Sequence, residues 1–126
     1  MTEQPQAETP QSPPILREVL WPVTDLQAAL SFYVGGLGMT LKFRDGDRFA
    51  AVAGADNVTL ALVTGTEAVT GSAPAPAYRV GDLAAAVGRA EESGAIVITR
   101  DEEGAHEHRA VLRDPAGHLL VLYQSR

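Results

Sequence analysis

Three side chains of this sequence have the chemistry of a metal or acid–base site: Glu18, His106 and His108. His106 and His108 stand two positions apart, a spacing that puts both imidazoles on one face of an extended strand. Two imidazoles and one carboxylate form a common non-haem metal site. However, Glu107 and Arg109 surround the two histidines, and this charged context favours a solvated strand end over a metal site.

Glu18 has two interpretations that the residues alone leave open. It is either a carboxylate that holds a cationic ligand or acts as a base, or a hydrated side chain near the start of a strand. Without a metal, the two histidines could still hydrogen-bond a ligand if they reach a cleft. Tyr123 is equally open, because its phenol could face a pocket or simply pack.

A sequence repeat predicts the elements that position these side chains. The segment Val23–Leu30 (VTDLQAAL) returns as Val80–Val87 (VGDLAAAV). The aspartate of each copy can accept hydrogen bonds from the first turn of a helix, and the Ala- and Leu-rich residues behind it favour a helix. Gly38 and Gly94 supply the backbone freedom that ends each helix. Two copies of one supersecondary unit are therefore expected.

Each copy reads as a βαβββ module. The first module is expected to have strands at 15–23, 39–44, 48–53 and 58–63, with a helix at 25–36. The second is expected to have strands at 75–80, 95–100, 106–113 and 118–124, with a helix at 82–93 and a charged turn at 101–104. The predicted fold class is α+β: two tandem modules form a curved eight-stranded sheet with a concave cleft and two helices on its convex side.

Composition sets the domain boundaries. Residues 1–14 contain four prolines and three glutamines and almost nothing apolar, which predicts a disordered tail. Residues 15–126 are expected to form a single domain, with module one at 15–63, a linker rich in small residues, Pro and Gly at 64–74, and module two at 75–126.

The bulk properties exclude several classes of protein. The 126 residues carry a formal net charge of −6 and no cysteine. An acidic chain is a poor partner for nucleic acid or an anionic membrane, and the absence of cysteine excludes disulfides and thiolate chemistry. Without an apolar run of about 20 residues or a secretory signal, we expect a cytoplasmic protein.

The motifs resemble those of the vicinal-oxygen-chelate group, which includes glyoxalase I, bleomycin-resistance proteins and extradiol dioxygenases. The resemblance covers roughly residues 15–126 and implies the fold just described. The residues that carry it are Val23-Thr24-Asp25-Leu26-Gln27-Ala28-Ala29, Phe32-Tyr33, Leu37-Gly38, Val80-Gly81-Asp82-Leu83, Gly94 and Arg113-Asp114-Pro115-Ala116-Gly117-His118-Leu119-Leu120.

The resemblance also implies where a divalent metal would be held, at one position on the first strand and one on the last strand of each half. Carried over, these positions are Glu18, Ala61, Ala75 and Val121. The side chains of Ala61, Ala75 and Val121 are hydrocarbon and cannot donate an electron pair to a metal. The single carboxylate of Glu18 cannot hold a catalytic metal, which needs about three protein ligands. No metal and no cofactor is therefore expected, as in the metal-free, bleomycin-resistance-like members.

Alternation along the strands, in the family's phase, predicts which side chains line the cleft. These are Glu18, Leu20, Thr59, Ala61, Ala77, Arg79, His106, His108, Ala110, Leu112, Val121 and Tyr123. The side chains of opposite phase are expected to pack on the helices, namely Val19, Trp21, Leu60, Leu62, Tyr78, Leu120 and Leu122.

Three functions remain open from the sequence. The favoured one is a metal-free protein that sequesters a small aromatic or amphipathic compound, such as an antibiotic. The alternatives are a glyoxalase-like lyase, isomerase or dioxygenase with displaced or absent metal ligands, and a non-catalytic regulatory or structural domain. No catalytic residue is assigned. The resemblance implies a homodimer, and neither nucleic acid nor a membrane is expected as a partner.

Overall fold

The computed structural model describes residues 12–126, so the predicted tail lies mostly outside the described residues. The described chain forms eight strands and two main helices in the predicted order. These elements are β1 (Ile15–Pro22), α1 (Leu26–Leu30) continued by a wider helical turn (Ser31–Gly36), β2 (Thr40–Asp45), β3 (Phe49–Ala53), β4 (Thr59–Val63), the short turn η2 (Gly65–Glu67), β5 (Ala75–Arg79), α2 (Leu83–Glu92), β6 (Ile96–Glu103), β7 (Glu107–Arg113) and β8 (Leu119–Ser125).

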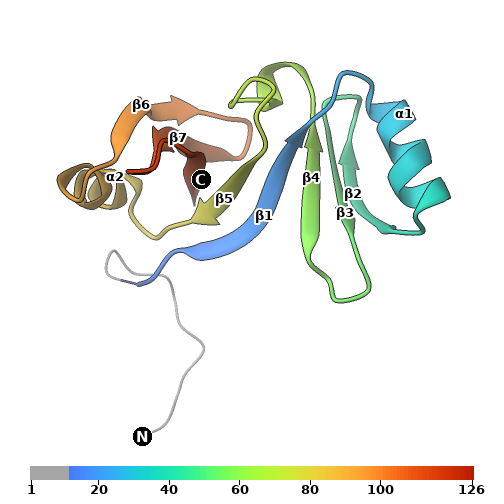
Figure 1. The fold of residues 1–126 in the computed structure, drawn as a ribbon, viewed down its shortest axis with the longest axis horizontal. Helices are drawn as coiled ribbons and strands as arrows, with labels where there is room; N and C mark the ends of the chain where they lie inside the picture. Colours follow the sequence, from blue (N-terminus) through green and yellow to red (C-terminus); the bar gives the residue numbers. More distant parts are fainter. Residues whose placement is uncertain (1–11) are drawn as a thin grey trace, which may run out of the picture.

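The eight strands form one mixed sheet in the order β2-β3-β4-β1-β5-β8-β7-β6. The first strand of each module pairs in parallel with the last strand of the same module, with Leu20 opposite Ala61 and Ala77 opposite Val121. The two modules meet where β1 and β5 run antiparallel. In Figure 1, β1 passes through the middle of the molecule, with a module on each side. The predicted α+β architecture is confirmed.

Both helices begin at the aspartates that the repeat indicated. The Asp25 carboxylate accepts a hydrogen bond from the Ala28 N–H at 3.0 Å, and Asp82 accepts from the Ala85 N–H at the same distance. These bonds satisfy donors that a helix start leaves unpaired. Beyond residue 30 the first helix widens, so that the Leu37 N–H bonds to the Phe32 carbonyl at 2.9 Å. The expected helix at 25–36 is therefore only partly α-helical.

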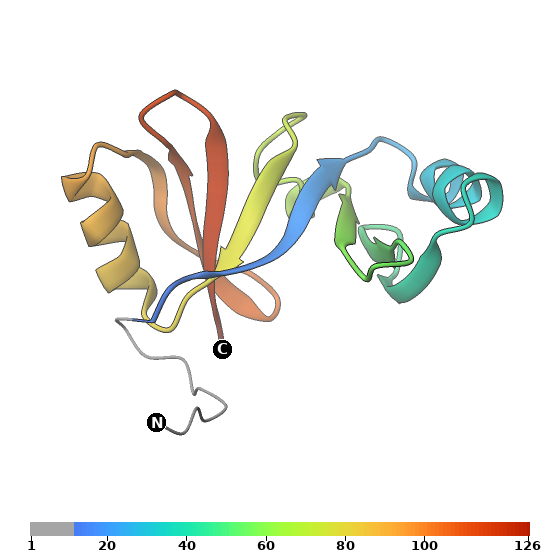
Figure 2. The same cartoon turned by 60° about the horizontal axis from the view of Figure 1, so that its bottom comes forward.

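Each helix covers one half of the same sheet face. Leu26 and Leu30 of α1 pack on Ala50, Val52 and Leu62. At the other end of the sheet, α2 packs on side chains of β7 and β8. The opposite face carries a third cluster between the two halves, formed by Leu20, Ala61, Val63, Ala77, Val111 and Val121. Figure 2 shows the two helices at opposite ends of the curved sheet.

The expected strand phase is wrong for β7. Val111 lies opposite Val121, and Ala110 opposite Leu122. Directly opposed residues share a face, so Val111 lies with Val121, whereas Ala110 and Leu112 pack beneath α2. The cleft placement predicted for Ala110 and Leu112 is therefore incorrect.

Two smaller expectations also fail. Asp101–Glu103, predicted as part of a turn, extend β6, because Glu102 and Glu103 pair with Arg109 and His108 of β7. Trp21 was expected to pack on a helix but is 36% exposed. Within residues 12–126, no helix is long and apolar enough to cross a membrane.

Leu62 offers a test of the packing under α1. It is completely buried against Leu26 and Leu30, so Leu62→Ala should lower the free energy of unfolding by about 2–5 kcal/mol. Leu41→Ala is the matched control, because Leu41 is 44% exposed and its truncation should change stability by less than about 1 kcal/mol. Urea unfolding of both variants measures the difference, and equal losses would contradict this packing.

Candidate functional site

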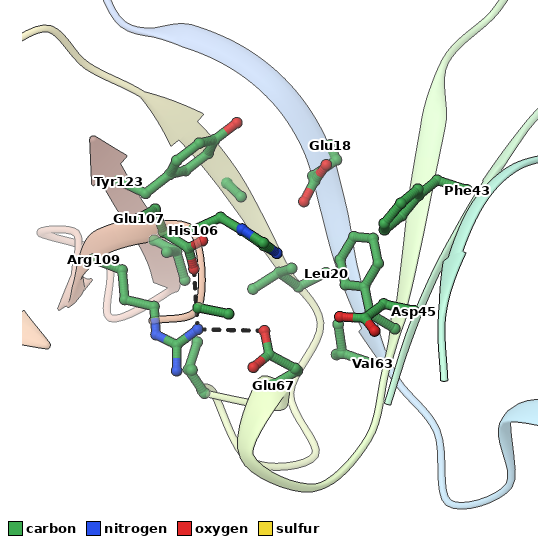
Figure 3. A pocket seen from close by; sticks show the side chains of 15 residues that line it. Glu18, Leu20, Phe43, Asp45, Val63, Glu67, His106, Glu107, Arg109 and Tyr123 are labelled. Atoms are coloured by element: carbon green, nitrogen blue, oxygen red, sulfur yellow. Dashed lines mark hydrogen bonds and ion pairs between the residues drawn. The ribbon is translucent and has the colours of Figure 1, made fainter. Parts of the chain in front are cut away.

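A cavity of about 260 Å³ opens on the sheet face away from the helices, between the two modules. Both halves of the chain contribute to it, as Figure 3 shows. The residues that line it are Glu18, Leu20, Phe43, Asp45, Phe49, Val63, Glu67, Val69, Ala77, Ala105, His106, Glu107, Arg109, Val121 and Tyr123.

The apolar part of the cavity comes from the middle of the sheet and from two aromatic rings. Leu20 and Val121 belong to the central cluster on this face. Phe43 of β2 and Phe49 of β3 lie with ring centroids 6.0 Å apart and ring planes 58° apart. Aromatic and aliphatic walls of this kind are typical of small-molecule sites.

The structure brings half of the predicted cleft residues together. Glu18, Leu20, Ala77, Val121 and Tyr123 line the cavity from β1, β5 and β8, and His106 lines it from the β6–β7 turn. Whether these residues bind a ligand stays a prediction.

The other predicted cleft residues lie elsewhere. Ala61 is buried in the central cluster rather than on the cavity wall, and Thr59 lies at the first residue of β4. Arg79 borders a separate shallow pocket with Gln124 and Ser125. The His108 ring lies 3.2 Å from the Asp101 carboxylate, and its side chain is 44% exposed.

Sequence reasoning missed the polar and aromatic wall of the cavity. Phe43 and Phe49 flank the hairpin turn at residues 46–48, and Glu67 stands in the segment predicted as a linker. Arg109 was read only as part of the charged context of the histidines. A correct register for β7 would have found Arg109, because Arg109 pairs directly with Tyr123.

Arg109 is a buried cation held by three carboxylates. Its side chain is 8% exposed, and it lies 3.1 Å from Glu107, 3.3 Å from Glu102 and 3.5 Å from Glu67. Its guanidinium also donates to the Thr66 carbonyl at 3.4 Å. This cluster joins β6, β7 and η2 and forms one end of the cavity (Figure 3).

The protein environment shifts the pKa values of Glu18 and Tyr123, which both line the cavity. Burial raises the pKa of the Glu18 carboxyl, the adjacent Arg17 lowers it, and Glu107 raises it further. Burial also raises the pKa of Tyr123, and the charge of Glu18 adds to this effect. In Figure 3 the Glu18 carboxylate points into the cavity between Phe43 and His106. A carboxyl with a raised pKa in a cleft is a common functional group.

The residues present do not fit the metal site that the fold implies. Of its four positions, Glu18 is the only one with an electron pair to donate, since the others are Ala61, Ala75 and Val121. Within residues 12–126, no group of three or more His, Asp or Glu side chains is arranged to hold a metal ion.

The paired βαβββ modules and the cavity between them define the vicinal-oxygen-chelate class of fold, and sequence comparison agrees. The model of the Glyoxalase/Bleomycin resistance protein/Dioxygenase superfamily matches residues 15–122. The chain therefore belongs to this superfamily.

One sequence relative and two solved structures are similar to this chain. An uncharacterized protein of Mycolicibacterium smegmatis (strain ATCC 700084 / mc(2)155) is 36% identical over 108 residues, which are 86% of this chain and 91% of the relative. A hypothetical protein from Bacillus halodurans C-125 has a TM-score of 0.71 at 19% identity, covering 91% of this chain and 96% of the other. Methylmalonyl-CoA epimerase from Mycobacterium tuberculosis has a TM-score of 0.65 at 22% identity, covering 88% and 87%. The two structural likenesses show the fold alone.

The raised pKa of Glu18 predicts a pH-dependent stability. The folded state binds the Glu18 proton more tightly than the unfolded state, whose carboxyl titrates near the ordinary value of 4.5. Ionisation of Glu18 therefore destabilises the fold as pH rises from 4.5 through the raised pKa. Glu18→Gln removes this ionisation. Relative to the Glu18→Gln variant, the wild-type protein should lose stability progressively over that range, as measured by denaturant unfolding at several pH values. A constant difference across the range would contradict the effect.

Arg109 provides a second test of the site. Arg109→Met leaves the half-buried Glu67 and Glu107 without a cation, so we expect a loss of about 3–5 kcal/mol in the free energy of unfolding. Arg100→Met is the matched control, because Arg100 pairs with Glu91 on the surface and its loss should cost less than about 1 kcal/mol. Denaturant unfolding of both variants checks the prediction, and a stable Arg109→Met protein would refute the structural role of the cluster.

Proposed function

We propose that this chain binds a small aromatic or amphipathic compound, such as an antibiotic, in the cavity between its modules, and that it does so without a metal. The observation that carries the proposal is the cavity itself. It joins an aromatic and aliphatic wall to a few polar side chains, which is the usual composition of a small-molecule site. Its volume of about 260 Å³ suits a ligand of one or two rings.

The donor set supports binding without a metal. The side chains of Ala61, Ala75 and Val121 offer no electron pair at the positions where the superfamily fold would hold an ion. A bound compound would therefore contact protein side chains rather than a metal ion. Metal analysis of the dialysed protein is therefore expected to find no stoichiometric zinc, iron or nickel, and retention of such an ion would overturn this part of the proposal.

An enzymatic function is the second candidate. The observation that favours it is that Glu18 and His106 line the same cavity, where a carboxylate and an imidazole could exchange protons with a substrate. Coenzyme A thioesters, which the names of the epimerases indicate as substrates, carry several phosphate charges that the carboxylates of this cavity would repel. An epimerase of that kind is therefore not favoured.

A thermal-shift screen of small aromatic compounds tests the proposal. A compound that binds only the folded state stabilises it by about 2.7 kcal/mol at a concentration 100 times its Kd. Ala77→Leu should weaken binding, because the larger side chain projects into the cavity. Ala84→Leu is the matched control, since Ala84 is exposed on α2. A protein that responds to no compound would contradict the binding function, and conversion of a bound compound would favour the enzyme.

A further inference from the structure

The charge around the cavity is unbalanced. Four carboxylates line it, from Glu18, Asp45, Glu67 and Glu107, against a single guanidinium from Arg109. The imidazole of His106 is the only other titratable nitrogen among the described residues of the lining. The side chains that line the cavity therefore carry a net negative charge when their carboxylates are ionised.

Most of these carboxylates already have a cation. Glu67 and Glu107 share Arg109 with Glu102. Asp45 accepts from the Arg48 guanidinium at 3.0 Å and 3.2 Å. The charge of Arg109 is thus used by its own neighbours and is not available to an acidic ligand.

Glu18 differs from the other three carboxylates. It is half-buried on the central strand β1, where its backbone pairs with Ala77, and its carboxylate accepts no hydrogen bond from any residue between 12 and 126. The adjacent Arg17 favours its charge only electrostatically. A partly desolvated carboxylate without a donor is costly, so a ligand that donates to Glu18 would recover free energy that the protein's own side chains do not supply.

The surroundings of Glu18 suit a cationic donor better than a neutral one. Phe43 stands beside the carboxylate in Figure 3, and Phe49 lies next to Phe43. Aromatic faces attract ammonium groups, and this attraction is stronger where water is excluded. A neutral hydroxyl would satisfy the hydrogen bond but leave the charge uncompensated. An anion would be repelled by Glu18 and by the excess of carboxylates around Arg109.

We propose that the cavity selects organic cations, in which a protonated amine bonds to Glu18 and an attached aromatic body packs on Phe43 and Phe49. This inference rests on the proposed binding function and names the ligand class for the same cavity. The carboxylate supplies the charge selectivity, and the aromatic and aliphatic wall supplies the affinity for the body.

Two matched series of probes test the selectivity. The first is phenethylamine, phenethyl alcohol and hydrocinnamate, and the second is naphthylmethylamine, naphthylmethanol and naphthylacetate. Within each series the aromatic body is constant while the head group is cationic, neutral or anionic. Calorimetric titration near neutral pH should give at least about tenfold tighter binding for the amine than for the alcohol, and weakest binding for the acid.

Glu18→Gln and Glu92→Gln assign the effect. Both remove one negative charge, but Glu92 is exposed at the end of α2, away from the cavity. The preference for amine over alcohol should disappear in Glu18→Gln and persist in Glu92→Gln, with unfolding curves showing that both variants are folded.

Each outcome decides between the two proposals. If the alcohol or the acid binds as tightly as the amine, or if Glu18→Gln keeps the preference, cation selectivity is overturned while the binding function stands. If no member of either series binds and the wider thermal-shift screen also finds nothing, the binding function fails and the inference fails with it.

Discussion

The antiparallel pairing of β1 with β5 is the interaction on which the rest of the structure depends. Each module alone is a four-stranded sheet with a helix on one face and nothing on the other. The pairing sets Glu18 opposite Ala77 and Leu20 opposite Ala75, and it turns two half-sheets into one. The central cluster and the cavity above it exist only because side chains from both modules meet along this seam. Small alanine side chains on β5 leave the space that larger residues would fill.

The placement of the charged side chains in the site depends on which of them have a partner of opposite charge. Arg109 could not be buried alone, because a desolvated guanidinium without partners is strongly unfavourable. Its three carboxylates come from a strand, the neighbouring strand and the segment that connects the modules, so the cluster also fixes that connection against β7. Glu18 lies in the same cavity without such partners, and this contrast is the reason for proposing that Glu18, unlike the carboxylates around Arg109, meets a ligand.

Much of the fold could be predicted from local chemistry. Asp25 and Asp82 cap the first turns of the two helices by local hydrogen bonds. Gly38 and Gly94, with positive φ values of 81° and 108°, follow the ends of those helices. The side of β7 that faces the cavity could not be predicted in this way, because the alternation along one strand does not show which of its two sets of side chains points toward the cavity. The turn between β7 and β8 decides that, by pairing Arg113 with Leu119 and hence Val111 with Val121.

The aromatic and charged residues of the cavity wall could not be predicted from the sequence, for a different reason. Phe43, Phe49 and Glu67 reach the cavity through the curvature of the sheet and the path of the connecting segment. Neither leaves a periodic signal in the sequence. Arg109 lies in a charged segment of the sequence, and the simplest interpretation of such a segment is a solvated strand end. Its burial depends on partners as far away in sequence as Glu67.

The two halves of the repeat have become chemically different while keeping the same backbone arrangement. Both rings of the aromatic pair come from module one, whereas the guanidinium, the imidazole and the phenol at the cavity come from module two. A cavity built from two identical modules would bind an elongated ligand in two opposite orientations with the same affinity. Because the two modules of this chain differ in these side chains, a ligand of the proposed kind with two unlike ends would have a single preferred orientation across the seam between β1 and β5.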